Sequence, residues 1–291
     1  MGRRGARLRI AAVLAGFLAT APADAQSLSD DLADMIARAR ATSLQQRFGR
    51  LLVDEGRDLE IDPAASVDKT RRTLLRRASV FENMREYASA EASLTQALEM
   101  APPIAAMYAA RGYFYMRRGR FSDALADFIL GARVEPGNAR LRHAAGRAQS
   151  ALGDFAAAIM HYDAAIRLAP REPIFYLARA EARIHLDQPG PARDDYDRAL
   201  DNRLQRATDR YFAFLGRGYS FLMQSDYPGA IADFGNALAI DPGSLSALMW
   251  RGYAHEKTGQ VGLALDDYER AVAVDPGDRL ARNNLQRLRS N

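Results

Sequence analysis

Apolar positions between residues 105 and 138 follow a helical period. Apolar side chains recur every three or four residues there, which places them on one face of a helix. Gly119 interrupts the pattern, and Pro136 with Gly137 ends it, because proline lacks the amide that a helix interior needs. The stretch therefore predicts two amphipathic helices joined by a short turn. The apolar positions are Tyr108, Tyr115, Met116, Phe121, Ala124, Leu125, Phe128 and Ile129.

This helical pair recurs six times along the chain. A small residue is followed twelve positions later by alanine, and successive copies are 34, 34, 34, 38 and 34 residues apart. Such a period indicates stacked repeats, in which each unit buries its apolar face on its neighbours. We expect the small side chains where the two helices of a pair cross closely, because larger ones would push them apart. The small residues are Ala78, Gly112, Gly146, Ala180, Gly218 and Gly252, and the alanines are Ala90, Ala124, Ala158, Ala192, Ala230 and Ala264.

A bulky apolar residue follows each alanine by one helical turn, and a proline closes most units. This pattern resembles the tetratricopeptide repeat. The resemblance implies an all-α fold, a right-handed α-solenoid of six tandem helix-turn-helix repeats within residues 66–278, followed by a C-terminal capping helix over 279–291. It also implies a protein–protein interaction adaptor or scaffold rather than an enzyme. The predicted repeats are 71–104, 105–138, 139–172, 173–210, 211–244 and 245–278.

The fourth predicted repeat departs from the period. It is four residues longer than the others and lacks the closing proline. We expect a lengthened second helix or a loop between Asp201 and Arg210, with a local change in superhelical twist. The single tryptophan, Trp250, also lies two residues past the position where the family places one.

Residues 1–25 have the pattern of a bacterial-type secretory signal peptide. Four arginines precede a short apolar stretch, and Ala23-Asp24-Ala25 gives a small-x-small cleavage pattern. We expect cleavage after Ala25 and a periplasmic or secreted protein, the alternative being a retained N-terminal anchor. Residues 26–65 are expected to form an N-terminal helical segment, and one interpretation of this segment is a degenerate repeat. No later apolar run is long enough for a transmembrane segment.

Charge and cysteine content narrow the function further. The whole chain carries a formal net charge of +4, but residues 1–25 hold four Arg and one Asp, so the remainder carries about +1. We therefore expect no nucleic-acid partner. The absence of cysteine excludes disulfides, thiolate catalysis and cysteine-based zinc sites.

The resemblance implies that the first helix of each repeat lines a concave groove. Residues one turn apart on these helices mix aromatic, apolar and basic side chains. Tyrosine and arginine are common anchors of protein interfaces. We therefore expect the groove to bind an extended or helical peptide with an apolar stretch and an acidic end. In the alternative reading the aromatics pack between repeats and the arginines are solvated. The predicted groove residues are Tyr113, Met116, Arg117, Arg140, His143, Arg147, Glu181, Phe212, Tyr219, Leu222, Tyr253 and Glu256.

Enzymatic motifs are missing from the repeats. The four histidines occupy different repeat positions, and no phosphate loop, zinc-protease motif or nucleophile elbow is complete. We expect no catalytic residues, no cofactor and no metal. The carboxylates of the second helices are expected on solvated surface. These are Asp194, Asp195, Asp233, Asp266 and Asp267.

Two other functional classes stay open. Arg117, Arg140 and Arg147 could bind an anionic polymer or a lipid headgroup, with an affinity that falls steeply with salt. An unrecognised enzyme, or an enzyme accessory subunit, would need a site within residues 26–70. The identity of the protein partner, the pathway and the oligomeric state are not predicted by the sequence.

Overall fold

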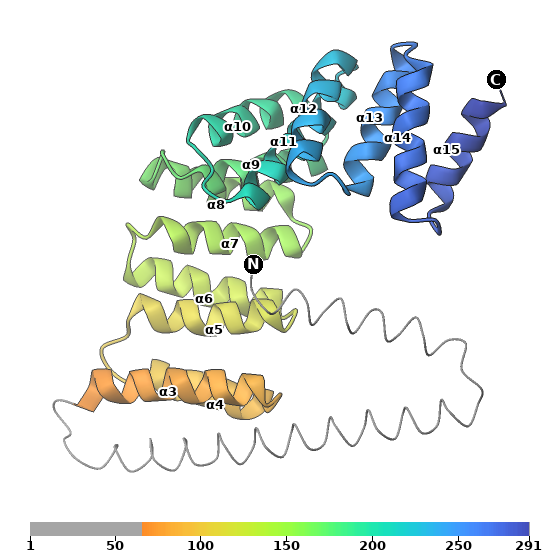
Figure 1. Cartoon of the computed structure of the whole chain (residues 1–291). Helices are drawn as coiled ribbons and strands as arrows, with labels where there is room; N and C mark the ends of the chain where they lie inside the picture. Colours follow the sequence, from red (N-terminus) through yellow and green to blue (C-terminus); the bar gives the residue numbers. More distant parts are fainter. Residues whose placement is uncertain (1–65, 291) are drawn as a thin grey trace, which may run out of the picture. The chain divides into compact units, whose positions relative to one another are not determined.

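The computed structural model describes residues 66–290, which form thirteen α-helices and no strand (Figure 1). The chain divides into two compact units after Ala101, and each is described by itself. The predicted all-α repeat solenoid is confirmed. The predicted signal peptide over 1–25 and the predicted helical segment over 26–65 lie outside the described residues. Among the helices that the structure describes, none is both long and apolar enough to cross a membrane.

The described part of the first unit is one helical pair, α3 (Ser66–Asn83) and α4 (Tyr87–Glu99). Ala78 of α3 and Ala90 of α4 are both buried in it. The guanidinium of the buried Arg71 donates a hydrogen bond to the carbonyl of Met100, at 2.5 Å, and so ties the start of α3 to the end of α4.

The second unit contains five helical pairs and a final single helix. Each helix packs against the next one along the chain, as the stack in Figure 1 shows. The first helices also contact one another from α7 to α9, from α9 to α11 and from α11 to α13, so they form one continuous layer. The elements are α5 (Ala105–Arg117), α6 (Phe121–Val134), α7 (Ala139–Ala151), α8 (Phe155–Leu168), α9 (Pro173–His185), α10 (Pro189–Asp201), α11 (Ala207–Met223), α12 (Tyr227–Ile240), α13 (Leu245–Lys257), α14 (Val261–Val274) and α15 (Arg279–Arg289).

Glycine in the first helix brings the two helices of a pair together. A Cβ added to Gly112 would lie 2.6 Å from the ring of Phe128, and one added to Gly146 would lie 2.5 Å from the ring of Tyr162. No real Cβ comes so close to another atom, so the ring and a side chain cannot share that space. Gly218 with Phe234 and Gly252 with Tyr268 repeat the arrangement. The alanine twelve positions after each small residue is buried throughout the described repeats.

The four extra residues of the fourth repeat do not lengthen its second helix, and most of them extend the first helix of the next repeat. Helix α10 has 13 residues, close to the 14 of α8, and only residues 202–206 separate it from α11. Helix α11 has 17 residues, whereas α9 and α13 have 13 each. Four residues are about one turn, so the insertion continues the helical hydrogen bonding of the next repeat at its N-terminal end. A loop therefore lies between Asp201 and Arg210, as one of the two expectations had it, whereas the expected lengthening of the second helix was wrong.

Several acids of the second helices are buried, contrary to the expectation of solvated surface. Asp195, Asp233 and Asp267 are at most 2% exposed, and so is Asp127 of α6. Each accepts two hydrogen bonds from an arginine 16 residues earlier, on the first helix of its own pair. A buried carboxylate persists only when it is paired and hydrogen-bonded. The arginines are Arg111, Arg179, Arg217 and Arg251.

Helix α15 covers the end of the last pair. Leu288 is buried and Leu285 packs beside it against Tyr268, while Leu280 is 61% exposed and faces solvent. The helix over 279–291 therefore covers the last repeat through Leu285 and Leu288, in line with the expected capping helix. The guanidinium of Arg287 also donates to both carboxylate oxygens of Glu256, at 2.8 and 2.7 Å.

Candidate functional site

The first helices of the second unit line a groove with a volume of about 850 Å³. Helices α5, α7, α9, α11 and α13 all contribute side chains, and the rings of Phe155, Tyr162 and Tyr196 reach it from the second helices. The walls combine aromatic and aliphatic side chains with a few charged groups. This is the composition typical of a site that buries an apolar ligand and orients it by polar contacts.

Half of the predicted groove residues line this groove, namely Met116, His143, Arg147, Glu181, Phe212 and Tyr219. Its remaining lining residues include Ile174, Leu177 and Leu215, at the same repeat positions. The other predicted residues lie outside the lining, and these are Tyr113, Arg117, Arg140, Leu222, Tyr253 and Glu256.

Local contacts explain where several of these outer residues lie. Tyr113 packs edge-on against Phe128, with the ring centroids 5.1 Å apart. Leu222 packs among the buried residues of the α11–α12 pair. Glu256 is held by Arg287 and the hydroxyl of Tyr268. Glu256 of α13 is therefore bound by Arg287 of α15 and is not available to a ligand.

Aromatic side chains form one end of the groove. Trp250 is 39% exposed and packs edge-on against Tyr219, with centroids 5.5 Å apart, and against Tyr253 at 6.2 Å. Phe212, also on α11, is 60% exposed and lines the same groove. Sequence reasoning did not place Trp250 in the groove. The signal was its position two residues before Gly252, where the second to fifth repeats have Ala110, Ala144, Ala178 and Gly216.

Three charged side chains line the groove: Arg147, Glu181 and Asp209. None of them makes an ion pair with another described residue, in contrast to the buried arginine–aspartate pairs. Asp209 was not predicted, because it lies on the additional turn of α11 and has no counterpart in the other repeats. The groove therefore presents two carboxylates and one guanidinium to a ligand.

His143 is a neutral part of the wall. Its ring lies between those of Tyr162 and Phe175, with centroid distances of 5.7 and 5.0 Å. Burial, and then the charge of Arg147, lower the pKa of His143 to about 4. His185, the last residue of α9, stacks on Phe155, the first residue of α8, with the ring centroids 4.1 Å apart. Among the described residues, no group of three or more acids and histidines could hold a metal ion.

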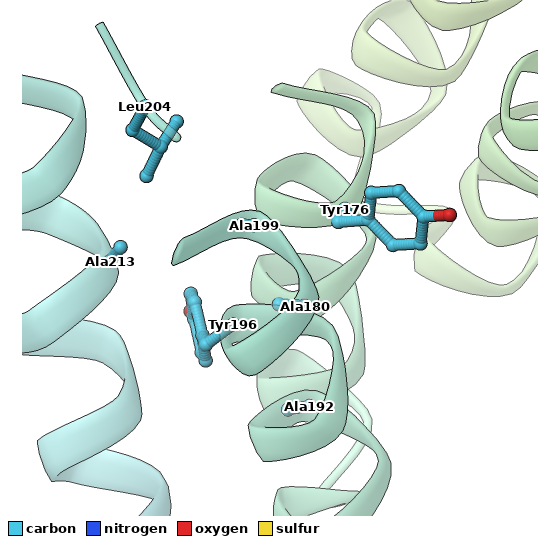
Figure 2. Close-up of a cluster of buried hydrophobic side chains, with 7 residues drawn as sticks. All are labelled: Tyr176, Ala180, Ala192, Tyr196, Ala199, Leu204 and Ala213. Carbon is cyan, nitrogen blue, oxygen red and sulfur yellow. The ribbon is translucent and has the colours of Figure 1, made fainter. Parts of the chain in front are cut away.

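Tyr196 differs from the other aromatic residues at its repeat position. The first helix of its pair has Ala180 at the crossing position, where four other pairs have glycine. The methyl group of Ala180 fills the space that an aromatic ring occupies in those four pairs, so the ring of Tyr196 cannot lie there. Figure 2 shows the ring of Tyr196 between α10 and α11, in a cluster with Ala213 of α11. Its hydroxyl lies close to Gly216. A Cβ at Gly216 would overlap that hydroxyl. Ala180 and Gly216 together direct the phenol into the groove.

The hydroxyl of Tyr196 also differs in its partners. The Tyr162 hydroxyl lies 3.0 Å from that of Ser150, and the Tyr268 hydroxyl donates to Glu256. Both partners lie twelve positions before the tyrosine, and at that position Tyr196 has the apolar Ile184. No other described residue gives it a hydrogen bond, although the residue is only 6% exposed. Burial, then the charges of Glu181 and Asp195, raise the pKa of Tyr196, so the hydroxyl keeps its proton.

Comparison with known families gives one match that covers most of the chain. A family model described as tetratricopeptide repeat matches residues 75–139, 143–209 and 215–279. Curated relatives match a shorter part. Dynein axonemal assembly factor 4 from Pongo pygmaeus and from Pan paniscus is 34% identical over 95 residues, which is 31% of this chain and 23% of each relative. The chain thus spans about a quarter of the length of these relatives.

Solved structures with the same helical arrangement are more distant in sequence. PilF of Pseudomonas aeruginosa is 14% identical with a TM-score of 0.62, over 77% of this chain and 99% of that one. YrrB, described as a TPR protein with an unusual peptide-binding site, is 18% identical with a TM-score of 0.57, over 66% and 97%. In the Cut9–Hcn1 structure of the APC/C, the matching chain is 14% identical with a TM-score of 0.61, over 75% and 42%. At these identities the likeness concerns the fold alone.

Proposed function

The chain belongs to the tetratricopeptide repeat family, whose fold supports protein–protein interaction scaffolds, and we propose that its groove binds a peptide segment of a partner protein. The observation that carries this proposal is the composition of the groove. A volume of about 850 Å³ is lined by exposed aromatic residues together with charged groups that have no ion pair among the described residues. Recognition of this kind needs no covalent chemistry, and the protein would act as an adaptor.

The aromatic end of the groove supports a segment with apolar side chains. Trp250, Tyr219 and Phe212 offer a large contact area and lose little conformational entropy on binding. Arg147, one repeat away from Glu181, supports an acidic residue at the other end of the bound segment. By analogy of fold, the description of YrrB as a peptide-binding protein also favours a peptide as the ligand.

An anionic polymer or lipid headgroup is the less favoured ligand. Of the three arginines considered for it, only Arg147 lines the groove, and Glu181 and Asp209 would repel an anion there. The balance of charge therefore favours a mixed peptide segment.

Export to the cell envelope is a separate part of the proposal and depends on the pattern of residues 1–25. The scaffold would then act in the periplasm or outside the cell. Mass spectrometry of the protein recovered from its native cells tests this. We expect a mature chain that begins at Gln26, and recovery of intact residues 1–25 would instead support a retained anchor.

The binding proposal is tested by selecting ligands for the whole chain from a phage-displayed library of random linear peptides. We expect enriched peptides that bind the wild type and bind Trp250→Ala at least tenfold more weakly, because the exposed ring is a central anchor. Met160→Ala is the matched control, since Met160 is 72% exposed on α8 and lies outside the groove. Equal loss in both variants, or no enrichment, would contradict the proposal.

A further inference from the structure

The centre of the groove carries two polar groups that lack hydrogen-bond partners among the described residues. The Tyr196 hydroxyl is directed there by Ala180 and Gly216. Glu181 lies on α9 directly after Ala180, and its charge acts on both Tyr162 and Tyr196. The carboxylate thus lies near both phenol rings, and no arginine or lysine of the described residues forms a salt bridge with it.

A ligand that covers the groove removes water from these two groups. A carboxylate and a hydroxyl that lose water without a replacement partner oppose binding. A cationic side chain supplies the replacement, because it donates to the carboxylate and to the oxygen of the phenol. The phenol keeps its own proton and can donate it to a peptide carbonyl. The chemistry of the pair therefore selects a positive group beside a peptide backbone.

The surroundings fit the stem of a long basic side chain. Leu177 of α9 and Leu215 of α11 line the same groove as Glu181 and Tyr196. Lysine and arginine bury their methylene groups on such apolar surface while the charged end meets its partner. Asp209 adds a second negative charge on α11, and Arg147 is the one arginine or lysine among the described groove residues.

We propose that Glu181 and the Tyr196 hydroxyl form a subsite for a lysine or arginine side chain of the bound segment. This inference rests on the proposed function, and it adds the chemistry of one residue of the partner. The predicted segment carries a basic residue at the Glu181 subsite, apolar residues toward Trp250 and an acidic residue toward Arg147.

The same peptide library tests the subsite when the selection is repeated on the whole chain with Glu181→Lys. We expect wild-type ligands to share a lysine or arginine at one position, and ligands of the variant to lose it or to carry an acid there. The best wild-type peptide should bind Glu181→Gln about tenfold more weakly and Tyr196→Phe a few fold more weakly, measured by fluorescence anisotropy. Asp266→Lys is the control, because Asp266 is an exposed acid of α14 outside the groove. Circular dichroism checks that each variant is folded.

The outcomes separate the two proposals. If Trp250→Ala abolishes binding but the ligands show no basic preference, or keep it with Glu181→Lys, the subsite is wrong and groove binding stands. If peptides bind all groove variants equally, or none is selected, the groove is not the binding site and both proposals fail. A preference for basic residues that follows the charge at position 181 supports both.

Discussion

At the scale of single residues, the protein depends on side chains that fill the space left by a neighbour. His143 illustrates this, because its ring is packed between two aromatic rings and beside Arg147. Protonation would bury a charge among these rings and would also place a second positive charge beside Arg147. The native protein therefore binds this proton less readily than the unfolded chain does.

The first prediction concerns this histidine and pH. The pKa of His143 is about 4 in the folded protein, below its ordinary value of 6.5. Its contribution is fully present above pH 6.5 and is lost as the pH falls toward 4, by up to about 3 kcal/mol. We expect His143→Gln to reduce the loss of stability over this window, measured by urea unfolding at several pH values. A pH dependence equal to that of the wild type would contradict this assignment.

The second prediction concerns the glycine crossings. Gly146→Leu should lower the free energy of unfolding by about 1–3 kcal/mol, because the Tyr162 ring occupies the space that the side chain needs. Gly262→Ala is the matched control in α14, where an added Cβ meets nothing within 4 Å. That change should be neutral or stabilise by about 0.5–1 kcal/mol. An unchanged melting temperature for Gly146→Leu would show that the close crossing is absent.

At the scale of helices, a buried ion pair fixes how the two members of a pair dock. The arginine of the first helix binds the aspartate of the second through two hydrogen bonds in four pairs. Arg179 and Arg217 also reach Asp163 and Asp197 on the preceding pair. At Arg251 the corresponding position is Gly235, so this arginine has no such second acid.

This difference gives the third prediction. Asp267→Ala should cost about 2–4 kcal/mol, because it leaves Arg251 without its bidentate partner inside the protein. Asp266→Ala changes the adjacent, exposed acid and should stay within about 0.5 kcal/mol of the wild type. Denaturant unfolding of the two variants measures both values. Similar midpoints would mean that the pair contributes little to docking.

At the scale of the whole molecule, periodicity was enough to predict the fold but not the details of the groove. Helices, turns and close crossings repeat every 34 residues, so one unit could be read from the others. Asp209, Trp250 and Tyr196 escaped prediction because each lies where one repeat departs from the rest. The burial of Asp195, Asp233 and Asp267 was also missed, since an acid in sequence looks solvated until its arginine is identified in space.

The fourth prediction concerns the class of ligand. A peptide held by aromatic contacts and a few opposite charges should lose less than about tenfold in affinity between 50 and 200 mM salt. Binding of a polyanion through many basic contacts would lose about 10³–10⁵-fold over the same range. Titration of the selected peptide and of heparin at both salt concentrations makes the comparison. A steep loss for the peptide would favour the anionic ligand class.

The alanine at position 180 has a consequence for how binding preference could change. One methyl group excludes the ring of Tyr196 from its own repeat and sends the phenol toward α11. Ala180→Gly would remove this methyl group, so the ring could pack within its own repeat as the rings of the other repeats do. The hydroxyl of Tyr196 would then no longer reach the groove. A residue that is itself fully buried, and never touched by a ligand, therefore controls what the surface can recognise. Selection acting on the interior of such an array can alter its choice of partner while every exposed side chain stays the same.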